Sequence, residues 1–193
     1  LGHITVLDPV GAGASKLRTE TAFRLLEEVR FSVIRGNVSE LKTLWGSEGK
    51  TKGVDANIAD RVTEENLDEM VQFAKSLSKK TGAVIAMTGA IDIVADQNQA
   101  YAIRNGNALM SKITGTGCML SGVVAAYCVA NPKHLLDATA AAVAAMGLSG
   151  EIGFERLKQT EGGGTSTYRT YILDAMSNMT DKILEEGMKL ESR

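Results

Sequence analysis

Thr114-Gly115-Thr116-Gly117-Cys118-Met119-Leu120 places two glycines in front of an apolar run. We expect a strand to end here and a helix to begin. The first turn of a helix leaves backbone N–H groups unpaired and carries the positive end of the helix dipole, so the stretch predicts an anion site. Glycines let the backbone approach a phosphate closely, and Cys118 in that first turn favours the thiolate form. The alternative is a glycine turn with a buried cysteine, because free cysteines are often buried.

The composition is that of one soluble globular domain. The chain has 193 residues, of which 44% are hydrophobic and 23% charged, enough to bury a substantial core. A net charge of -2 and an isoelectric point near 5.8 argue against nucleic-acid or anionic-membrane partners, because both need clustered positive charge. The two cysteines, Cys118 and Cys128, form no disulfide framework, and a reducing cytoplasm is the simpler compartment. No apolar run reaches the length of a transmembrane helix.

The start of the chain has the pattern of a buried strand followed by a glycine turn. Residues 4–7 are largely apolar on both faces, as in the strands of a covered parallel sheet, and the run stops at Asp8-Pro9. In open parallel sheets, ligands bind at the carboxyl ends of the strands. Asp8 therefore suits a magnesium ion, held directly or through water. The alternative is that Asp8 caps the turn, since Asp before Pro is common in turns.

A second strand is predicted over 31–34, after a helix over 18–30, and polar residues follow it. Asn37 and Glu40 are three positions apart at the start of the next helix. They either face the same solvent space as Asp8 or close a capping box around the helix start. The capping box explains both residues but leaves Arg35 unexplained.

The remaining pattern completes a layered α/β fold. A buried strand over 83–87 ends at Thr88, and partial alternation over 91–103 predicts a small hairpin array. Residues 45–61 have no periodicity and are expected to form a surface excursion. Apolar helices are expected after residue 116 and over 137–150. A last helix is expected to follow the glycine turn at 162–164 in the sequence. The alternation of strand, turn and helix predicts a three-layer α/β/α sandwich with a mainly parallel central sheet.

Four segments, in this order, resemble the hydroxyethylthiazole kinase family of the ribokinase-like superfamily. They are residues 7–14 (LDPVGAGA), 34–40 (IRGNVSE), 88–92 (TGAID) and 114–118 (TGTGC). The resemblance runs over nearly the whole chain. It implies a single ribokinase-like domain over 1–193 that lacks the family's N-terminal portion. Because members of the family are trimers with active sites at subunit boundaries, it also implies a homotrimer for the complete protein.

The resemblance implies transfer of the ATP γ-phosphate to the hydroxyl of 4-methyl-5-(2-hydroxyethyl)thiazole, with Mg²⁺, in the salvage of thiazole for thiamine. It makes Arg35 and Thr88 contacts of ATP. It makes Gly115 a contact of the substrate. Asp8 and Glu40 match the acidic positions near magnesium and phosphate.

The same resemblance gives the opening stretch its role. An anion hole is implied for Gly115, Thr116, Gly117 and Cys118. Cys118 occupies the position where most ribokinase relatives carry an Asp base, and we hypothesise that its thiol accepts or orients the proton of the acceptor hydroxyl. This substitution argues against the hydrate dehydratases of the same fold and against the hydroxymethylpyrimidine kinases.

Two rival interpretations come from other classes of protein. The first is a non-catalytic fragment that binds adenine nucleotide or serves only in assembly. The second is a dinucleotide-dependent oxidoreductase. It is weaker, because the glycine pairs at 11–13 and 115–117 lack the third glycine of the dinucleotide-binding fingerprint, and no ribose-binding acid follows.

Overall fold

The computed structural model describes residues 2–46 and 61–193 and contains a six-stranded sheet in the order β1-β2-β3-β4-β5-β6. Three strands form a parallel half: β1 (Val6–Leu7), β2 (Val33–Asn37) and β3 (Val84–Thr88). Val6 is paired with Val33, and Ile34 with Ile85. β2 and β3 are buried over most of their length, which explains the apolar start of β2 and the nearly continuous apolar sequence of β3.

The other half of the sheet is antiparallel. It consists of β4 (Asp92–Ala95), β5 (Ala100–Ile103) and β6 (Leu190–Ser192). The hairpin of β4 and β5 confirms the array expected over 91–103. β6 was not predicted; it pairs with β5 through a register that places Tyr101 opposite Ser192.

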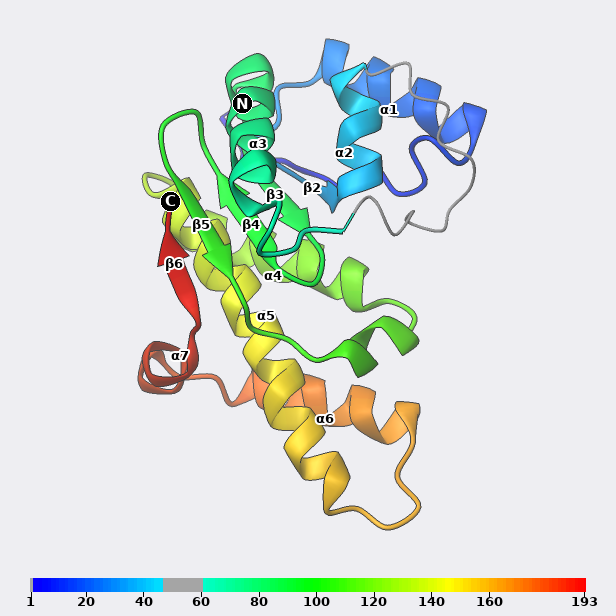
Figure 1. The fold of residues 1–193 in the computed structure, drawn as a ribbon, viewed down its shortest axis with the longest axis vertical. Helices are drawn as coiled ribbons and strands as arrows, with labels where there is room; N and C mark the ends of the chain where they lie inside the picture. Colours follow the sequence, from blue (N-terminus) through cyan, green and yellow to red (C-terminus); the bar gives the residue numbers. More distant parts are fainter. Residues whose placement is uncertain (1, 47–60) are drawn as a thin grey trace.

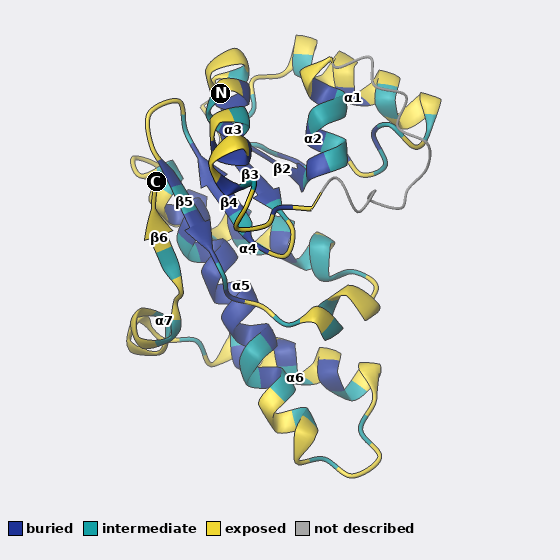
Figure 2. Cartoon of the chain, in the orientation of Figure 1, coloured by how far each residue is buried: buried dark blue, intermediate teal, exposed yellow. Residues whose placement is uncertain are grey.

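Helices cover both faces of the sheet, so the predicted three-layer sandwich is confirmed (Figure 1). One layer contains α1 (Lys16–Glu28), α2 (Val38–Trp45) and α3 (Leu67–Thr81). The other contains α4 (Thr116–Ala130), α5 (Leu135–Lys158), α6 (Thr165–Ser177) and the short α7 (Asp181–Gly187). Figure 2 shows the buried residues concentrated in the strands and along α5.

The α3 helix shows why the sequence begins and ends an element where it does. Asp68 and Glu69 stand in the first turn, where carboxylates are stabilised by the positive end of the helix dipole. Lys79 and Lys80 stand in the last turn, next to the negative end. Gly82 follows with a φ of 74°, a left-handed conformation that favours glycine, and this ends the helix before β3.

The α5 helix is the central element of the second layer. Its alanine-rich sequence and its glycines allow close packing, and a Cβ at Gly147 would lie 2.7 Å from the backbone of Asn105. Tyr168 of α6 is fully buried, and its hydroxyl donates a hydrogen bond to the Gly150 carbonyl at 2.8 Å. α5 is long and apolar enough to span a membrane by length and composition, but 67% of its apolar window is buried inside the fold. We therefore describe α5 as a core helix.

The segment before the opening stretch is not a strand, which corrects the expectation from the sequence. A 3₁₀ helix, η2 (Ala108–Lys112), lies there instead, and the Asn107 side chain accepts a hydrogen bond from the Leu109 N–H at its start. The physical reason is this cap, because a side chain that accepts from a backbone N–H near it favours the start of a helical turn over an extended segment. The excursion predicted over 45–61 lies mostly outside the described residues.

Candidate functional site

The parallel strands deliver polar side chains to one edge of the sheet. Asp8 follows β1, Arg35 lies inside β2 and Thr88 ends β3. Because the carboxyl ends of parallel strands meet at the same edge, these residues lie close together although they are far apart in sequence. The start of α4 reaches the same place through Gly117.

Arg35 is the centre of this cluster. Its Nη1 donates to Asp8 Oδ2 at 2.7 Å and to the Gly117 carbonyl at 2.9 Å. The Arg35 side chain is 9% exposed and that of Asp8 is 17% exposed, so solvent screens this ion pair weakly. Thr88 lies at the margin, with its Oγ1 3.5 Å from Arg35 Nη2.

One donor of Arg35 has no partner. Among the buried side-chain nitrogen and oxygen atoms of the described residues, Nε of Arg35 is the atom without a hydrogen bond. Leaving a buried donor unpaired costs on the order of 1–3 kcal/mol. The N–H therefore marks a position where an acceptor on a ligand would be stabilised.

The start of α4 has the features expected of an anion site. Gly115 precedes the helix with a φ of 100°, a conformation that favours glycine, and no described side chain caps the helix. The Thr116 hydroxyl is directed back to the Met110 and Ile113 carbonyls, each at 3.4 Å. Gly117 is needed for a second reason, because a Cβ there would lie 3.1 Å from Arg35 Nη1.

The two cysteines have different environments. Cys118 is exposed in the first turn of α4, whereas Cys128 is fully buried in the same helix. The Cys128 sulfur lies 3.4 Å from Thr139 Oγ1, and burial raises the pKa of its thiol. Cys118 is thus the cysteine available to a ligand at the sheet edge.

Glu40 connects two turns of the site. Its Oε1 accepts from the Gly11 N–H and its Oε2 from the Asn37 N–H, both at 3.0 Å. The Asn37 side chain accepts from the Glu40 N–H in return, so the capping box considered from the sequence is present. Glu40 thereby joins the turn after β1 to the start of α2. Its assignment to magnesium stays a prediction.

Sequence reasoning missed Ser121 and Asp92. Ser121 of α4 donates from Oγ to Asp8 Oδ2 at 3.0 Å. Its spacing of four from Gly117, which is one helical turn, was the signal available in the sequence.

Asp92 accepts from the Gly89 N–H at 2.8 Å and so closes the turn after β3. Burial raises the pKa of Asp92 to about 7, against the opposing effects of the Gly89 hydrogen bond and the Arg35 charge. Asp92 is the last residue of segment 88–92, one of the four segments that resemble the family.

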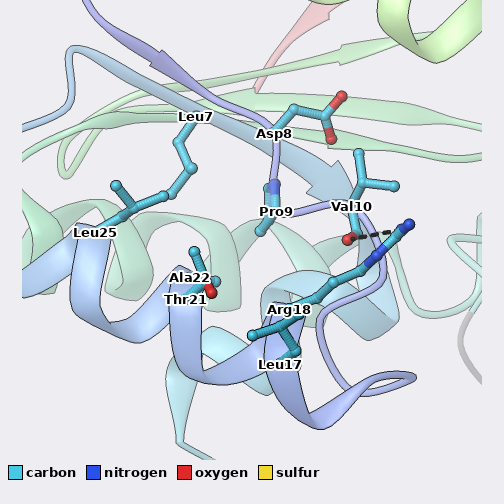
Figure 3. Close-up of a pocket in the computed structure, with 9 residues that line it drawn as sticks. All are labelled: Leu7, Asp8, Pro9, Val10, Leu17, Arg18, Thr21, Ala22 and Leu25. Carbon is cyan, nitrogen blue, oxygen red and sulfur yellow. Dashed lines mark hydrogen bonds between the residues drawn. The ribbon is translucent and has the colours of Figure 1, made fainter.

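A hollow of about 440 Å³ lies beside the cluster, between the turn after β1 and α1 (Figure 3). Its wall is largely apolar, with Leu7 and Leu25 facing one another. Arg18 crosses its rim and donates to the Val10 carbonyl at 3.4 Å. The Asp8 carboxylate points away from the apolar side chains of α1.

The fold and this site define a ribokinase-like α/β/α protein. The same fold is found in the Staphylococcus aureus pyridoxal kinase in complex with AMP-PCP and pyridoxal, with a TM-score of 0.55, covering 98% of this chain and 62% of that one. At 18% identity that likeness concerns the fold alone.

The profile of the hydroxyethylthiazole kinase family matches residues 2–182, and the chain belongs to this family. The hydroxyethylthiazole kinase of Clostridium acetobutylicum is 55% identical over 192 residues, which are 100% of this chain and 70% of that protein. The one from Clostridium tetani is 43% identical and covers 96% of this chain and 65% of its own length. The structure of the Pyrococcus horikoshii hydroxyethylthiazole kinase protein is 27% identical with a TM-score of 0.80, covering 98% and 65% of the two chains. The chain thus spans about two thirds of the length of these relatives.

Proposed function

We propose that this protein transfers the γ-phosphate of ATP to the hydroxyl of 4-methyl-5-(2-hydroxyethyl)thiazole in the salvage of thiazole for thiamine. The observation that carries the proposal is the guanidinium of Arg35, which has an unpaired Nε and contacts the uncapped start of α4 through its Nη1. Both features favour a ligand with several negative oxygens. Membership of the hydroxyethylthiazole kinase family supports the choice of nucleotide and acceptor.

Phosphoryl transfer depends mainly on positioning and on the neutralisation of charge. In the proposed mechanism Arg35 and the backbone N–H groups of residues 115–118 hold the phosphate oxygens. Thr88, at the end of β3, contacts the nucleotide, and Gly115 contacts the thiazole alcohol. The low exposure of Arg35 strengthens these electrostatic interactions, because little water reaches the guanidinium.

We assign to Cys118 the role of handling the proton of the acceptor hydroxyl. Its thiol is exposed in the first turn of α4, next to the N–H groups proposed to hold the transferred phosphate. In a loose transition state the proton of the acceptor hydroxyl leaves late, so a modest base or a hydrogen-bonding group suffices. Cys118 accepts that proton or orients the hydroxyl.

Asp8 is the residue that fits a magnesium ion best. Its carboxylate is half-buried at the edge of the anion site and offers the hard oxygen that Mg²⁺ prefers. The described residues contain no group of three His, Cys, Asp or Glu able to hold a metal by themselves. This agrees with a magnesium ion bound by one or two carboxylates together with substrate phosphates, with Glu40 on the adjoining turn. When bound, the ion neutralises charge on the phosphates.

The proposal extends to one ribokinase-like domain over 1–193 in a cytoplasmic homotrimer without nucleic-acid or membrane partners. The net charge of -2 supports the last point. A second candidate is a nucleotide-binding or assembly role without catalysis. It is kept because the chain spans about two thirds of the length of its relatives.

The test is an assay of the full-length gene product with MgATP and the thiazole alcohol. Formation of the thiazole phosphate, separated by chromatography and identified by its mass, is the expected result. Thermal unfolding with and without MgATP is measured in parallel. A rise in Tm with MgATP but no phosphorylated thiazole would reject the kinase reaction and favour the second candidate.

A further inference from the structure

Ser121 occupies the space between the two charges of the site. It lies one helical turn beyond Gly117 on α4, and its Oγ is 3.0 Å from Asp8 Oδ2. Arg35 Nη1 lies 3.4 Å from the same hydroxyl. The Gly117 carbonyl is 3.3 Å away, so three polar groups meet at this oxygen.

A hydroxyl has one proton to donate and lone pairs with which to accept. The Asp8 carboxylate is the stronger acceptor, because it is charged, and it is closer than the Gly117 carbonyl. The proton of Ser121 therefore goes to Asp8, and its lone pairs face Arg35. A side chain that both donates and accepts matches the two opposite charges.

The two oxygens of the Asp8 carboxylate therefore have different surroundings. Oδ2 accepts from both Arg35 and Ser121, at 2.7 and 3.0 Å. Within residues 2–46 and 61–193, the hydrogen bonds found for the Asp8 carboxylate both end on Oδ2, and none ends on Oδ1. Two donors on one oxygen fix the rotation of the carboxylate, and the second oxygen keeps its lone pairs.

We propose that Ser121 is a positioning residue that holds Oδ2 of Asp8 so that Oδ1 is presented to the magnesium ion accompanying the nucleotide. The inference rests on the proposed function for the identity of that ion. Ser121 touches neither substrate nor metal and acts through Asp8. Groups that orient a ligand in this way typically change metal affinity by about 10- to 100-fold when they are removed.

A serine in a helix often bonds only to the carbonyl four residues earlier, without any role in a site. Ser149 of α5 does this, with its Oγ 2.8 Å from the Ala145 carbonyl. For Ser121 the equivalent bond is the longer 3.3 Å contact to Gly117, and the shorter bond goes to the carboxylate. Ser149 is therefore the matched control.

The experiment measures binding of Mn²⁺, used in place of Mg²⁺, in the presence of saturating ADP, by electron paramagnetic resonance. We expect Ser121→Ala to weaken Mn²⁺ binding about 10-fold. Ser121→Cys, which keeps a similar volume but is a weak donor, should weaken Mn²⁺ binding as well. Ser121→Thr keeps the hydroxyl and should bind Mn²⁺ as the wild type does. Ser149→Ala should bind Mn²⁺ as the wild type does. Circular dichroism shows which variants are folded, and Ser121→Ala and Ser121→Cys give independent readings of the lost hydroxyl.

A second readout is the Mg²⁺ dependence of thiazole phosphorylation at saturating ATP. Ser121→Ala should raise the half-saturating Mg²⁺ concentration about 10-fold, with kcat at high Mg²⁺ recovering to within a few-fold. Mn²⁺ binding within twofold of wild type in folded Ser121→Ala and Ser121→Cys would overturn the inference. If the wild type binds Mn²⁺ and ADP but phosphorylates no thiazole, the proposed function fails, while weaker Mn²⁺ binding by the variants still supports the positioning role.

Discussion

The guanidinium of Arg35 in β2 lies 2.7 Å from the carboxylate of Asp8, the residue that directly follows the neighbouring strand β1, although the two residues are 27 positions apart. The same Nη1 bonds the Gly117 carbonyl, so one nitrogen connects β2 with the turn after β1 and with α4. The other two nitrogens of the guanidinium lie elsewhere, Nη2 at 3.5 Å from Thr88 Oγ1 and Nε without a partner, and a lysine has no planar fork with which to place three nitrogens in this way.

Arg35→Lys should therefore lower kcat/KM for ATP by about 30- to 100-fold, equivalent to about 2–3 kcal/mol of transition-state stabilisation. Arg24→Lys is the control, because the Arg24–Glu28 pair of α1 is exposed and should matter little. Steady-state kinetics with varied ATP measure the effect. Equal kcat/KM values for the two variants would contradict the assigned role of Arg35.

Gly117→Ala tests whether the guanidinium and the helix start must approach closely. The new Cβ would lie 3.1 Å from Arg35 Nη1 and displace it, so activity should fall by about 10- to 100-fold. Gly122→Ala in the same helix is the matched control, since a Cβ there meets nothing within 4 Å. That variant should keep full activity and gain about 0.5–1 kcal/mol of stability, measured by urea unfolding. Full activity of Gly117→Ala would show that the close approach is unnecessary.

Cys118→Ala tests the proton role of the exposed thiol. Loss of a general base lowers turnover by about 100-fold or more, and we expect this in kcat with little change in KM for ATP. Cys128→Ala should keep its turnover and lose stability instead, because Cys128 is fully buried. Turnover of Cys118→Ala within a few-fold of wild type at every pH would leave Cys118 a merely positional residue.

Asp92 should make stability depend on pH. Its pKa is about 7 in the folded protein, above the ordinary value of 3.8, so the folded state binds the proton more tightly than the unfolded state. The free energy of unfolding should therefore fall as pH rises from about 4 to 7, with a slope of up to about 1.4 kcal/mol per pH unit from this group. Below about pH 4 the contribution is fully present.

Asp92→Asn should remove this slope and be more stable than the wild type at pH 8, because its amide oxygen still accepts from the Gly89 N–H but cannot ionise. Asp96→Asn is the control, since Asp96 also accepts backbone hydrogen bonds, from Asn98 and Gln99, in the turn between β4 and β5. Urea unfolding at several pH values checks both variants. A slope that survives in Asp92→Asn would assign it to another group.

The parallel half of the fold could be predicted from the sequence, because its strands are continuous apolar runs that end in polar or glycine turns. The same logic placed Asp8, Arg35 and Thr88 at one edge, and glycines marked the start of α4 at Gly115. These signals are local, since each depends on a few neighbouring residues. For this reason these features can be predicted from the sequence without knowledge of the tertiary structure.

The features that were missed depend on distant contacts. β6 contains a single apolar residue, Leu190, and forms because β5 offers it a free edge. Ser121 has the sequence context of an ordinary helical serine, and its role arises only when β1 brings Asp8, 113 positions earlier, against α4. η2 is a local exception, because the Asn107 side chain caps a helical turn where a strand was expected.

The bond from the Gly11 amide to Glu40 has a consequence for hydrogen exchange. An amide in a short glycine turn normally exchanges with solvent deuterium quickly, but this one exchanges only when Glu40 releases it. Slow exchange at Gly11 would therefore report that the first turn of α2 is closed. The exchange rate of this single amide thus reports whether the carboxyl edge of the sheet is assembled.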